Sequence, residues 1–388
     1  MTASTSTTTS SPGATPNVAR PGSIKSKLLP SLGILLVTGG VFLLAWFAWL
    51  WFNPGPAPYR YQLVEAGDGA QFGQLGLEPW PDLAIAKYEI RAEGVDQPLA
   101  IAHTAKRGQM PPVMLDWENR TSELLLSVDN KLPELAALSA AIARHAPRDA
   151  LILAWWDTSR QIHLLAARDT LFTSRLGEPL IVPAHWQSRS DSIRRYEDSF
   201  WGSSPDEKEQ RQFQRFADAL LATPEKGAAQ LRELAGEREA YLVIHVTDLY
   251  KLGLLRPEQF DITYKNFPME GNMHGLIGYL KNWMQSNNFH TYTLQSLSDK
   301  MVRGYFLRDD QSSHTLIAQM LPFTETMPLD LTALQLIYQQ GGYWVYQIPG
   351  GKSASAPAPA PAPAPDPLSS PDSPSSPSGS APAPAAGS

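Results

Sequence analysis

The segment from Leu28 to Phe52 carries no charged side chain and is rich in Leu, Val, Phe and Trp. About 20 consecutive apolar residues are enough for a helix to cross the hydrocarbon core of a membrane. Trp46, Trp49 and Trp51 lie near the C-terminal end of the segment, where an aromatic belt would meet the lipid headgroups. The sequence therefore predicts a single transmembrane helix over residues 28–52.

Positive charges precede this segment, at Arg20, Lys25 and Lys27. Such charges stay on the cytoplasmic side, so we expect a protein of the cytoplasmic (inner) membrane with its N-terminus in the cytoplasm and its large C-terminal part in the periplasm. A cleaved signal peptide is the alternative, but the apolar run is too long and residues 53–58 offer no small-x-small cleavage site. A buried core helix fits less well, because its flanks are of low complexity on one side and Pro-rich on the other.

Both ends of the chain have compositions that do not support a folded core. Residues 1–27 begin with a long run of Thr, Ser, Pro and Ala, and residues 350–388 are almost wholly Ala, Pro, Ser and Gly. Neither end buries enough apolar surface to offset its chain entropy, so both are predicted to be disordered. The Ala-Pro run at 356–365 predicts an extended polyproline II spacer, and we favour an inert tail over a docking motif.

Charge and composition exclude several classes of protein. The net charge is −6 and the Lys and Arg residues are scattered, so no nucleic-acid partner is expected. The absence of cysteine excludes disulfides, thiolate metal sites, iron–sulfur ligation and haem attachment through Cys-x-x-Cys-His. The eight histidines are dispersed, and no phosphate-binding, dinucleotide-binding, serine-hydrolase or zinc-protease motif occurs. We therefore expect no cofactor, no metal site and no catalytic residues, and hence a protein that is not an enzyme.

Residues 59–130 are predicted to form a β-rich region. Four short runs show partial alternation of apolar and polar side chains and are broken by Gly, Pro and Asp. They are Tyr59–Val64, Ala84–Ile90, Pro98–Ala102 and Leu124–Val128.

Residues 131–349 alternate between helical and strand patterns. The expected helices are 134–145, 159–168, one or two within 205–235, 249–255 and 275–287. The expected strands are the buried runs 150–154 and 240–246, then 289–293, 301–307, 315–319 and 343–348. This alternation predicts an α/β domain with a mixed, partly parallel sheet.

The residues that follow the first buried strand are the strongest candidate for a site. Ala150–Ala154 is apolar at every position, and Trp155, Trp156 and Asp157 stand where that strand must end. In α/β sheets, ligands bind beyond the carboxyl ends of the strands. Adjacent side chains of an extended chain point to opposite faces, so at most one indole is expected in the core. The other is expected to meet a ligand, a partner or a covering loop.

Asp157 has two interpretations, which are compatible. Its carboxylate accepts hydrogen bonds from a ligand or helps to bind a cation, or it caps the next helix by accepting the backbone N–H of Ser159 or Arg160. Arg160 and Arg168 on that helix either pair with Asp157 and Asp169 or present a cationic rim to an anion.

Two further clusters carry weaker signals. His245 and Asp248 stand near the end of the second buried strand and repeat the pattern of the first. In residues 194–202, Phe200 and Trp201 are flanked by charged side chains, which suits a loop that packs aromatic rings over the sheet or onto a partner. At least one of these rings is expected to pack in the core, and Trp201 joins the candidate binding residues.

Five runs of unusual sequence carry a resemblance to a known family. They are Pro30–Leu35, Trp46–Phe52, Ala150–Ile162, Arg168–Ser174 and Tyr196–Gly202. With them, the stretch from Leu29 to about Ile348 resembles the hydroxylamine oxidation protein HaoB of ammonia-oxidising and some methane-oxidising bacteria. The resemblance implies an anchored protein linked with hydroxylamine oxidoreductase, a multihaem periplasmic enzyme. It carries over no catalytic residues, because none are established for the family.

A shorter stretch, from Pro147 to about Thr170, resembles the soluble domain of oligosaccharyltransferase catalytic subunits, in which a Trp-Trp-Asp run holds the acceptor Ser or Thr hydroxyl. The Tyr-Gly that follows this run in the family is Thr158 and Ser159 here. The family's many membrane helices with metal-binding carboxylates are missing, so the resemblance implies a shared binding fold and no glycosyl transfer.

Two hypotheses for the function follow. The first is a membrane-anchored accessory protein that binds hydroxylamine oxidoreductase or associated cytochromes of the electron route to quinone. The second is a periplasmic module that binds a peptide segment or a small polar ligand above Trp155–Asp157.

Overall fold

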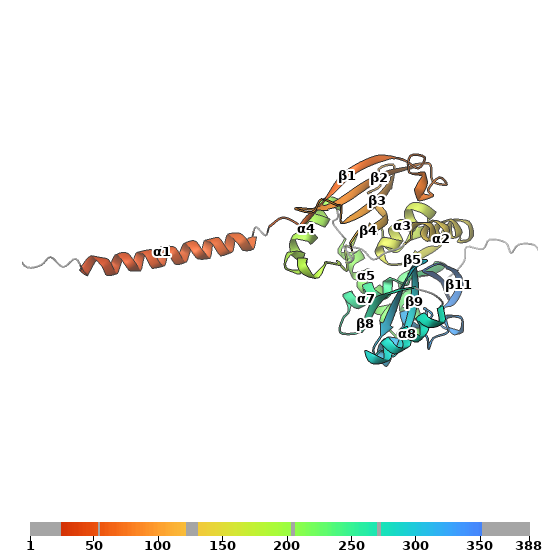
Figure 1. Ribbon diagram of the computed structural model, residues 1–388. Helices are drawn as coiled ribbons and strands as arrows, with labels where there is room; N and C mark the ends of the chain where they lie inside the picture. Colours follow the sequence, from red (N-terminus) through yellow and green to blue (C-terminus); the bar gives the residue numbers. More distant parts are fainter. Residues whose placement is uncertain (1–24, 53–54, 122–130, 203–205, 270–272, 351–388) are drawn as a thin grey trace, which may run out of the picture. The chain divides into compact units, whose positions relative to one another are not determined.

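The computed structural model describes residues 25–52, 55–121, 131–202, 206–269 and 273–350 (Figure 1). The predicted strand Leu124–Val128 and most of the two termini predicted to be disordered lie outside these residues.

The predicted apolar helix is present as α1 (Lys25–Phe52), which begins three residues before the uncharged run. Its span Ser31–Trp49 has no side chain buried against the rest of the protein. Within the described residues, α1 is the one helix long and apolar enough to cross a membrane. The rings of Trp46 and Trp49 stack with their centroids 5.6 Å apart.

A four-stranded antiparallel sheet follows, in the order β1-β2-β3-β4. Its strands are β1 (Tyr59–Asp68), β2 (Leu83–Ala92), β3 (Ala100–Arg107) and β4 (Val113–Asn119), and the short 3-10 helix η1 (Gly73–Leu75) lies between β1 and β2. The β-rich character of this region is confirmed, although the prediction omitted β4. In β4, Val113, Leu115 and Trp117 are buried and alternate with more exposed residues.

The predicted mixed sheet is the five-stranded sheet β11-β12-β7-β5-β6. Its strands are β5 (Leu151–Leu153), β6 (Asp169–Thr170), β7 (Ala240–His245), β11 (Gln335–Gln340) and β12 (Tyr343–Ile348). Strand β5 pairs in parallel with β6 and β7, whereas β12 pairs antiparallel with β7 and β11. Leu153 faces one hydrophobic core and Ile152 the other, which explains why the strand has no polar face.

Helices cover both faces of this sheet. Figure 1 shows α2 (Leu132–His145) and α3 (Trp156–Ala166) between the two sheets, and their apolar side chains share one core with β2, β4, β5 and β7. The opposite core contains α5 (Glu207–Leu221) and α6 (Pro224–Ala235). Helix α4 (Ser190–Trp201), preceded by η2 (Ala184–Arg189), packs on the four-stranded sheet.

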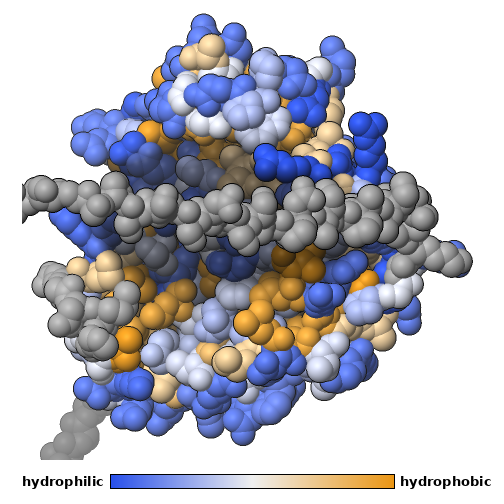
Figure 2. Space-filling view, turned by 90° about the vertical axis from the view of Figure 1, so that its right-hand side faces the viewer, coloured by the Kyte–Doolittle hydropathy of each residue, from blue (hydrophilic) through white to orange (hydrophobic). Residues whose placement is uncertain are grey.

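The remaining elements form a smaller layer. Helix α7 (Asp248–Leu255) leads to the antiparallel sheet β8-β10-β9, which packs against α8 (Met273–Ser286). The strands are β8 (Ile262–Pro268), β9 (Thr291–Ser298) and β10 (Met301–Leu307), and short helices follow at α9 (Asp310–Ser313), α10 (Leu316–Gln319) and η3 (Pro328–Asp330). In Figure 2, hydrophilic residues cover much of the visible surface of this layer and of the four-stranded sheet, and hydrophobic residues gather toward the middle.

The predicted strand 315–319 is wrong, because this segment is the helix α10. Thr315 precedes the helix, and its hydroxyl accepts a hydrogen bond from the backbone N–H of Ala318 at 3.4 Å. A β-branched, apolar run of five residues is ambiguous between the two structures, and the threonine cap favours the helix here.

Candidate functional site

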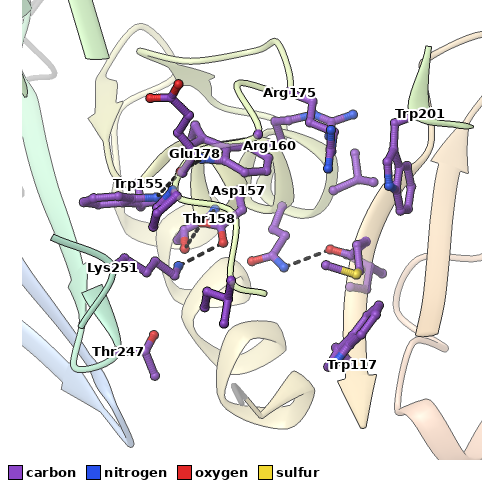
Figure 3. A pocket seen from close by; sticks show the side chains of 18 of the residues that line it. Trp117, Trp155, Asp157, Thr158, Arg160, Arg175, Glu178, Trp201, Thr247 and Lys251 are labelled. Atoms are coloured by element: carbon purple, nitrogen blue, oxygen red, sulfur yellow. Dashed lines mark hydrogen bonds and ion pairs between the residues drawn. The ribbon is translucent and has the colours of Figure 1, made fainter. Parts of the chain in front are cut away.

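A cavity of about 70 Å³ lies beyond the carboxyl ends of the parallel strands β5 and β7 (Figure 3). Its walls come from β4, α3, the segment 175–181, α4 and the turn between β7 and α7. Five of the six predicted site residues line it, and the sixth does not. Those five are Trp155, Trp156, Asp157, Arg160 and Trp201.

The two indoles lie in different environments, as the sequence predicted. Trp155 is 1% exposed and packs edge-on against Phe213, with ring centroids 5.1 Å apart. Trp156 is only partly buried, and its Nε1 donates a hydrogen bond to the carbonyl of Glu178 at 2.5 Å. Trp155 therefore belongs to the core behind the sheet, and Trp156 holds the segment that covers the cavity.

Asp157 does not cap helix α3 in the way the sequence predicted. The helix already begins at Trp156, so Asp157 lies in its first turn, and the N–H of Ser159 bonds to the carbonyl of Trp155 instead. The Asp157 carboxylate accepts the backbone N–H of Thr158 at 2.7 Å through Oδ1. Its Oδ2 accepts from Lys251 Nζ at 2.9 Å. The main partner of Asp157 is thus a cation contributed by α7.

Lys251 joins two carboxylates at the base of the cavity. Its Nζ lies 2.9 Å from Asp157 and 3.1 Å from Asp248, whose side chain is fully buried. Burial by itself disfavours the charged ammonium, but the two carboxylates outweigh it and raise the pKa of Lys251. Burial also raises the pKa of Asp248, and the charge of Lys251 opposes that rise. The sequence pointed to Asp248 only weakly and to Lys251 not at all.

Arg160 enters the cavity from the middle of α3. It is 8% exposed, and its Nη2 donates to the carbonyl of Pro112 at 2.9 Å. Its Nε has no hydrogen-bond partner in the part of the chain that the structure describes. Burial, together with the positive charge of Arg175, lowers the pKa of Arg160 to about 10, so the guanidinium stays charged at neutral pH.

Arg168 is the predicted site residue that the structure does not bring to the cavity. It follows α3, and its guanidinium donates to the carbonyls of Ala143 at 2.6 Å and of Ala146 at 3.2 Å. It also bonds to the carbonyl of Ala166 at 3.3 Å. These carbonyls end α2 and α3, so Arg168 satisfies helix termini instead of presenting a cation to a ligand.

Trp201 belongs to a buried polar cluster on α4, and the predicted loop at 194–202 is a helix instead. The Glu197 carboxylate accepts hydrogen bonds from Tyr59 at 2.6 Å, from Trp201 Nε1 at 2.9 Å and from Arg175 at 3.0 Å. Burial raises the pKa of Glu197, and Arg175 opposes that rise. The guanidinium carbon of Arg175 lies 5.9 Å from the Trp156 ring and 5.7 Å from the Trp201 ring. The cluster therefore connects α4, β1 and the cavity wall.

Phe200, three residues after Glu197 on α4, stacks on Tyr61 of β1 with ring centroids 4.1 Å apart. The aromatic residues of α4 thus pack over the four-stranded sheet. Sequence reasoning missed both Glu197 and Arg175. The signal for Glu197 was a carboxylate placed directly between the aromatic residues of 196–201.

His245 ends β7 and also lines the cavity. Its Nδ1 lies 2.7 Å from the hydroxyl of Thr247, and its backbone N–H donates to Asp248 at 2.9 Å. Burial and the nearby charge of Lys251 lower the pKa of His245 to about 3. The imidazole is therefore neutral in the folded protein at neutral pH.

This neutral histidine predicts an acid sensitivity. Below the unfolded-state pKa of about 6.5, the unfolded chain takes up a proton at His245 and the folded chain does not, so stability falls as the pH falls toward 3. Between pH 7 and pH 5, we expect this residue to lower the free energy of unfolding by about 2 kcal/mol. Urea denaturation at both pH values should show that loss reduced by the same amount in His245→Asn. Identical pH dependence in the two proteins would contradict the assignment.

The chemistry available at the cavity is charge and hydrogen bonding. Within the described residues, no group of three or more His, Asp or Glu side chains is arranged to hold a metal ion. The walls combine three cations, Arg160, Arg175 and Lys251, with indole rings and buried carboxylates. Such walls favour a small polar or charged ligand over an apolar one.

Comparisons with known proteins bear out one of the two resemblances. The C-terminal domain of PglB from C. jejuni, a crystal structure, is 11% identical and aligns over 55% of this chain and 98% of its own, with a TM-score of 0.32. That score is too low to establish a common fold. A search of curated proteins gives no match. The family model for the HaoA-associated protein HaoB matches residues 25–348, which include α1 and every described strand. The chain therefore belongs to the HaoB family of HaoA-associated proteins.

Proposed function

We propose that this protein is a membrane-anchored accessory factor in hydroxylamine oxidation that acts by binding and not by catalysis. Its partner is HaoA, the hydroxylamine oxidoreductase, or a cytochrome that receives electrons from it. The observation that carries the proposal is the family match over residues 25–348, since the family is named for its association with HaoA.

The anchor is α1, with the globular part on the periplasmic side. Two features support this arrangement. The family match begins at Lys25, the first residue of α1, so the apolar helix belongs to the matched region. Lys25 and Lys27 precede the uncharged span, and Trp46 and Trp49 lie at its far end, as the positive-inside rule and the aromatic belt require.

A direct binding measurement tests the partner. Full-length protein in detergent is immobilised and exposed to purified hydroxylamine oxidoreductase, with an unrelated multihaem cytochrome as the control. We expect saturable binding with a Kd in the micromolar range or tighter for the oxidoreductase alone. Equal binding of the oxidoreductase and the control cytochrome would contradict the proposed partnership. The same holds if neither the oxidoreductase nor, in the same assay, a cytochrome that receives its electrons binds.

The orientation is tested separately with a reporter fused after Ile348. We expect a reporter that works only after export to show activity in this fusion. Arg20, Lys25 and Lys27 hold the N-terminus in the cytoplasm, so the part of the chain after α1 lies on the other side of the membrane. Activity of a reporter that works only in the cytoplasm would overturn the orientation, and with it any direct contact with a periplasmic oxidoreductase.

The cavity favours a second candidate function, that of a binding module for a small polar ligand or a segment of a partner. Trp156, Arg160 and Trp201 line a space that is bounded by charged groups and lies at the carboxyl ends of two parallel strands. This is the edge at which α/β sheets bind ligands. The two functions are compatible, because an accessory protein can recognise its partner through this cavity.

A further inference from the structure

The cations that line the cavity differ in how they are neutralised. Lys251 lies within 3.1 Å of two carboxylates, Asp157 and Asp248. Arg175 lies 3.0 Å from Glu197 and 3.4 Å from Asp198. In the described part of the chain, Arg160 forms no ion pair, although it is 8% exposed. Arg160 is therefore a buried guanidinium that has no carboxylate at ion-pair distance among the described residues, and Asp157 and Glu209 act on it only from further away.

This arrangement is electrostatically unfavourable in the empty cavity. A buried charge without an ion-pair partner loses its hydration. For Arg160, the hydrogen bond to the Pro112 carbonyl and the more distant carboxylates of Asp157 and Glu209 offset part of that loss. Figure 3 shows the guanidinium groups of Arg160 and Arg175 extending to the same part of the cavity, and the repulsion between them contributes to the lowered pKa of Arg160. An anion placed beside these groups would reduce the repulsion between the two guanidinium groups. It would also accept a hydrogen bond from the unpaired N–H of Arg160 Nε.

Shape and size narrow the choice of anion. A cavity of about 70 Å³ holds a group of only a few heavy atoms. The planar guanidinium fork matches a planar group with two or three oxygens, which it binds through parallel hydrogen bonds. The guanidinium of Arg175 also lies near the centroids of the Trp156 and Trp201 rings, at 5.9 and 5.7 Å.

We propose that this cavity binds a small planar oxyanion, of the carboxylate type, against Arg160 and Arg175. The anion is either a free small acid or a carboxylate carried by a segment of a partner. The inference rests on the second candidate function, that the cavity is a binding site, and is independent of the choice of oxidoreductase as partner.

Titration of the full-length protein in detergent tests the proposal, with sodium formate as the free anion and sodium chloride at equal ionic strength as its control. For the partner-borne source, the peptide acetyl-Gly-Asp-Gly-amide is compared with acetyl-Gly-Asn-Gly-amide. Binding is followed by tryptophan fluorescence and by the thermal midpoint. We expect formate, the Asp peptide or both to bind saturably, and chloride and the Asn peptide not to do so. Formate binding indicates a free acid, and binding of the peptide alone indicates a partner's carboxylate.

Substitution of Arg160 gives the decisive comparison. Arg160→Gln should weaken binding by at least about tenfold, since it removes a charge-assisted interaction. Arg215→Gln is the matched control, because it makes the same change of charge at an exposed site on α5 and should leave the affinity unchanged. In anion-free buffer Arg160→Gln should unfold no earlier than wild type, because a buried charge without a close ion-pair partner is removed.

Arg160→Lys serves as a second variant that keeps the charge but not the fork, and it should bind more weakly than wild type. The proposal is overturned if no probe binds more strongly than its control, or if Arg160→Gln binds as tightly as wild type. Because binding of hydroxylamine oxidoreductase is measured on the same preparation, failure of the anion site and failure of the partnership are told apart.

Discussion

Replacing Glu197 with alanine is expected to lower the free energy of unfolding by about 3–5 kcal/mol, because a buried charged partner is removed from a connected network. The carboxylate accepts hydrogen bonds from Tyr59, Trp201 and Arg175, which belong to three separate segments of the chain. Without it, the Tyr59 hydroxyl and the Trp201 indole N–H lose their acceptor in a buried environment. Urea denaturation of the full-length protein at pH 7 measures the loss.

Asp198 offers a matched control for this change. It is the next residue, carries the same charge and pairs with the same arginine at 3.4 Å, but its side chain is 47% exposed. Asp198→Ala is therefore expected to cost less than about 1 kcal/mol. A similar loss in the two variants would show that burial of the Glu197 network contributes nothing special to stability.

Lys251→Met should be comparably destabilising, by about 3–5 kcal/mol, because it leaves Asp157 and the fully buried Asp248 facing one another without a cation. The loss should shrink as the pH is lowered, since protonation of Asp248 removes the uncompensated charge. Lys226→Met, at an exposed position of α6, should change stability by less than about 0.5 kcal/mol.

A double variant makes this test specific. Adding Asp248→Asn to Lys251→Met should recover part of the lost stability, because the remaining buried pair is no longer doubly negative. If the losses from the two single substitutions simply add, Lys251 and Asp248 do not act as a pair, and the interpretation of the cavity base is wrong.

The elements that the sequence predicted best are those with a local signal. Strands β5 and β7 are apolar at nearly every position, as expected for strands covered on both faces, and their ends located the cavity at Trp155–Asp157. The uncharged run was likewise sufficient to predict α1. The segment 315–319 shows the limit of such reasoning, since a single threonine cap decided between strand and helix.

The residues that the sequence did not predict are those whose role depends on distant packing. Lys251 meets Asp157 across 94 positions of the chain, and Glu197 meets Tyr59 across 138. Arg160 and Arg168 looked equivalent, but Arg160 lies on the cavity side of α3 and Arg168 lies past its end, among helix carbonyls. No property of these side chains distinguishes them before the helix has a fixed position between two sheets.

The walls of the cavity have a consequence for the order in which the protein is completed. Met114, Trp156, Trp201 and Lys251 stand on segments made early, midway and late in synthesis, and all four line the same space. A nascent chain has no complete pocket until α7 and then β12, which contributes Tyr343, have been synthesised and have packed in place. A ligand in the pocket contacts segments synthesised early and late, so its binding free energy stabilises all of them together against unfolding. A partner that recognises the filled pocket would accordingly bind completely folded molecules and would not bind chains whose synthesis or folding is incomplete.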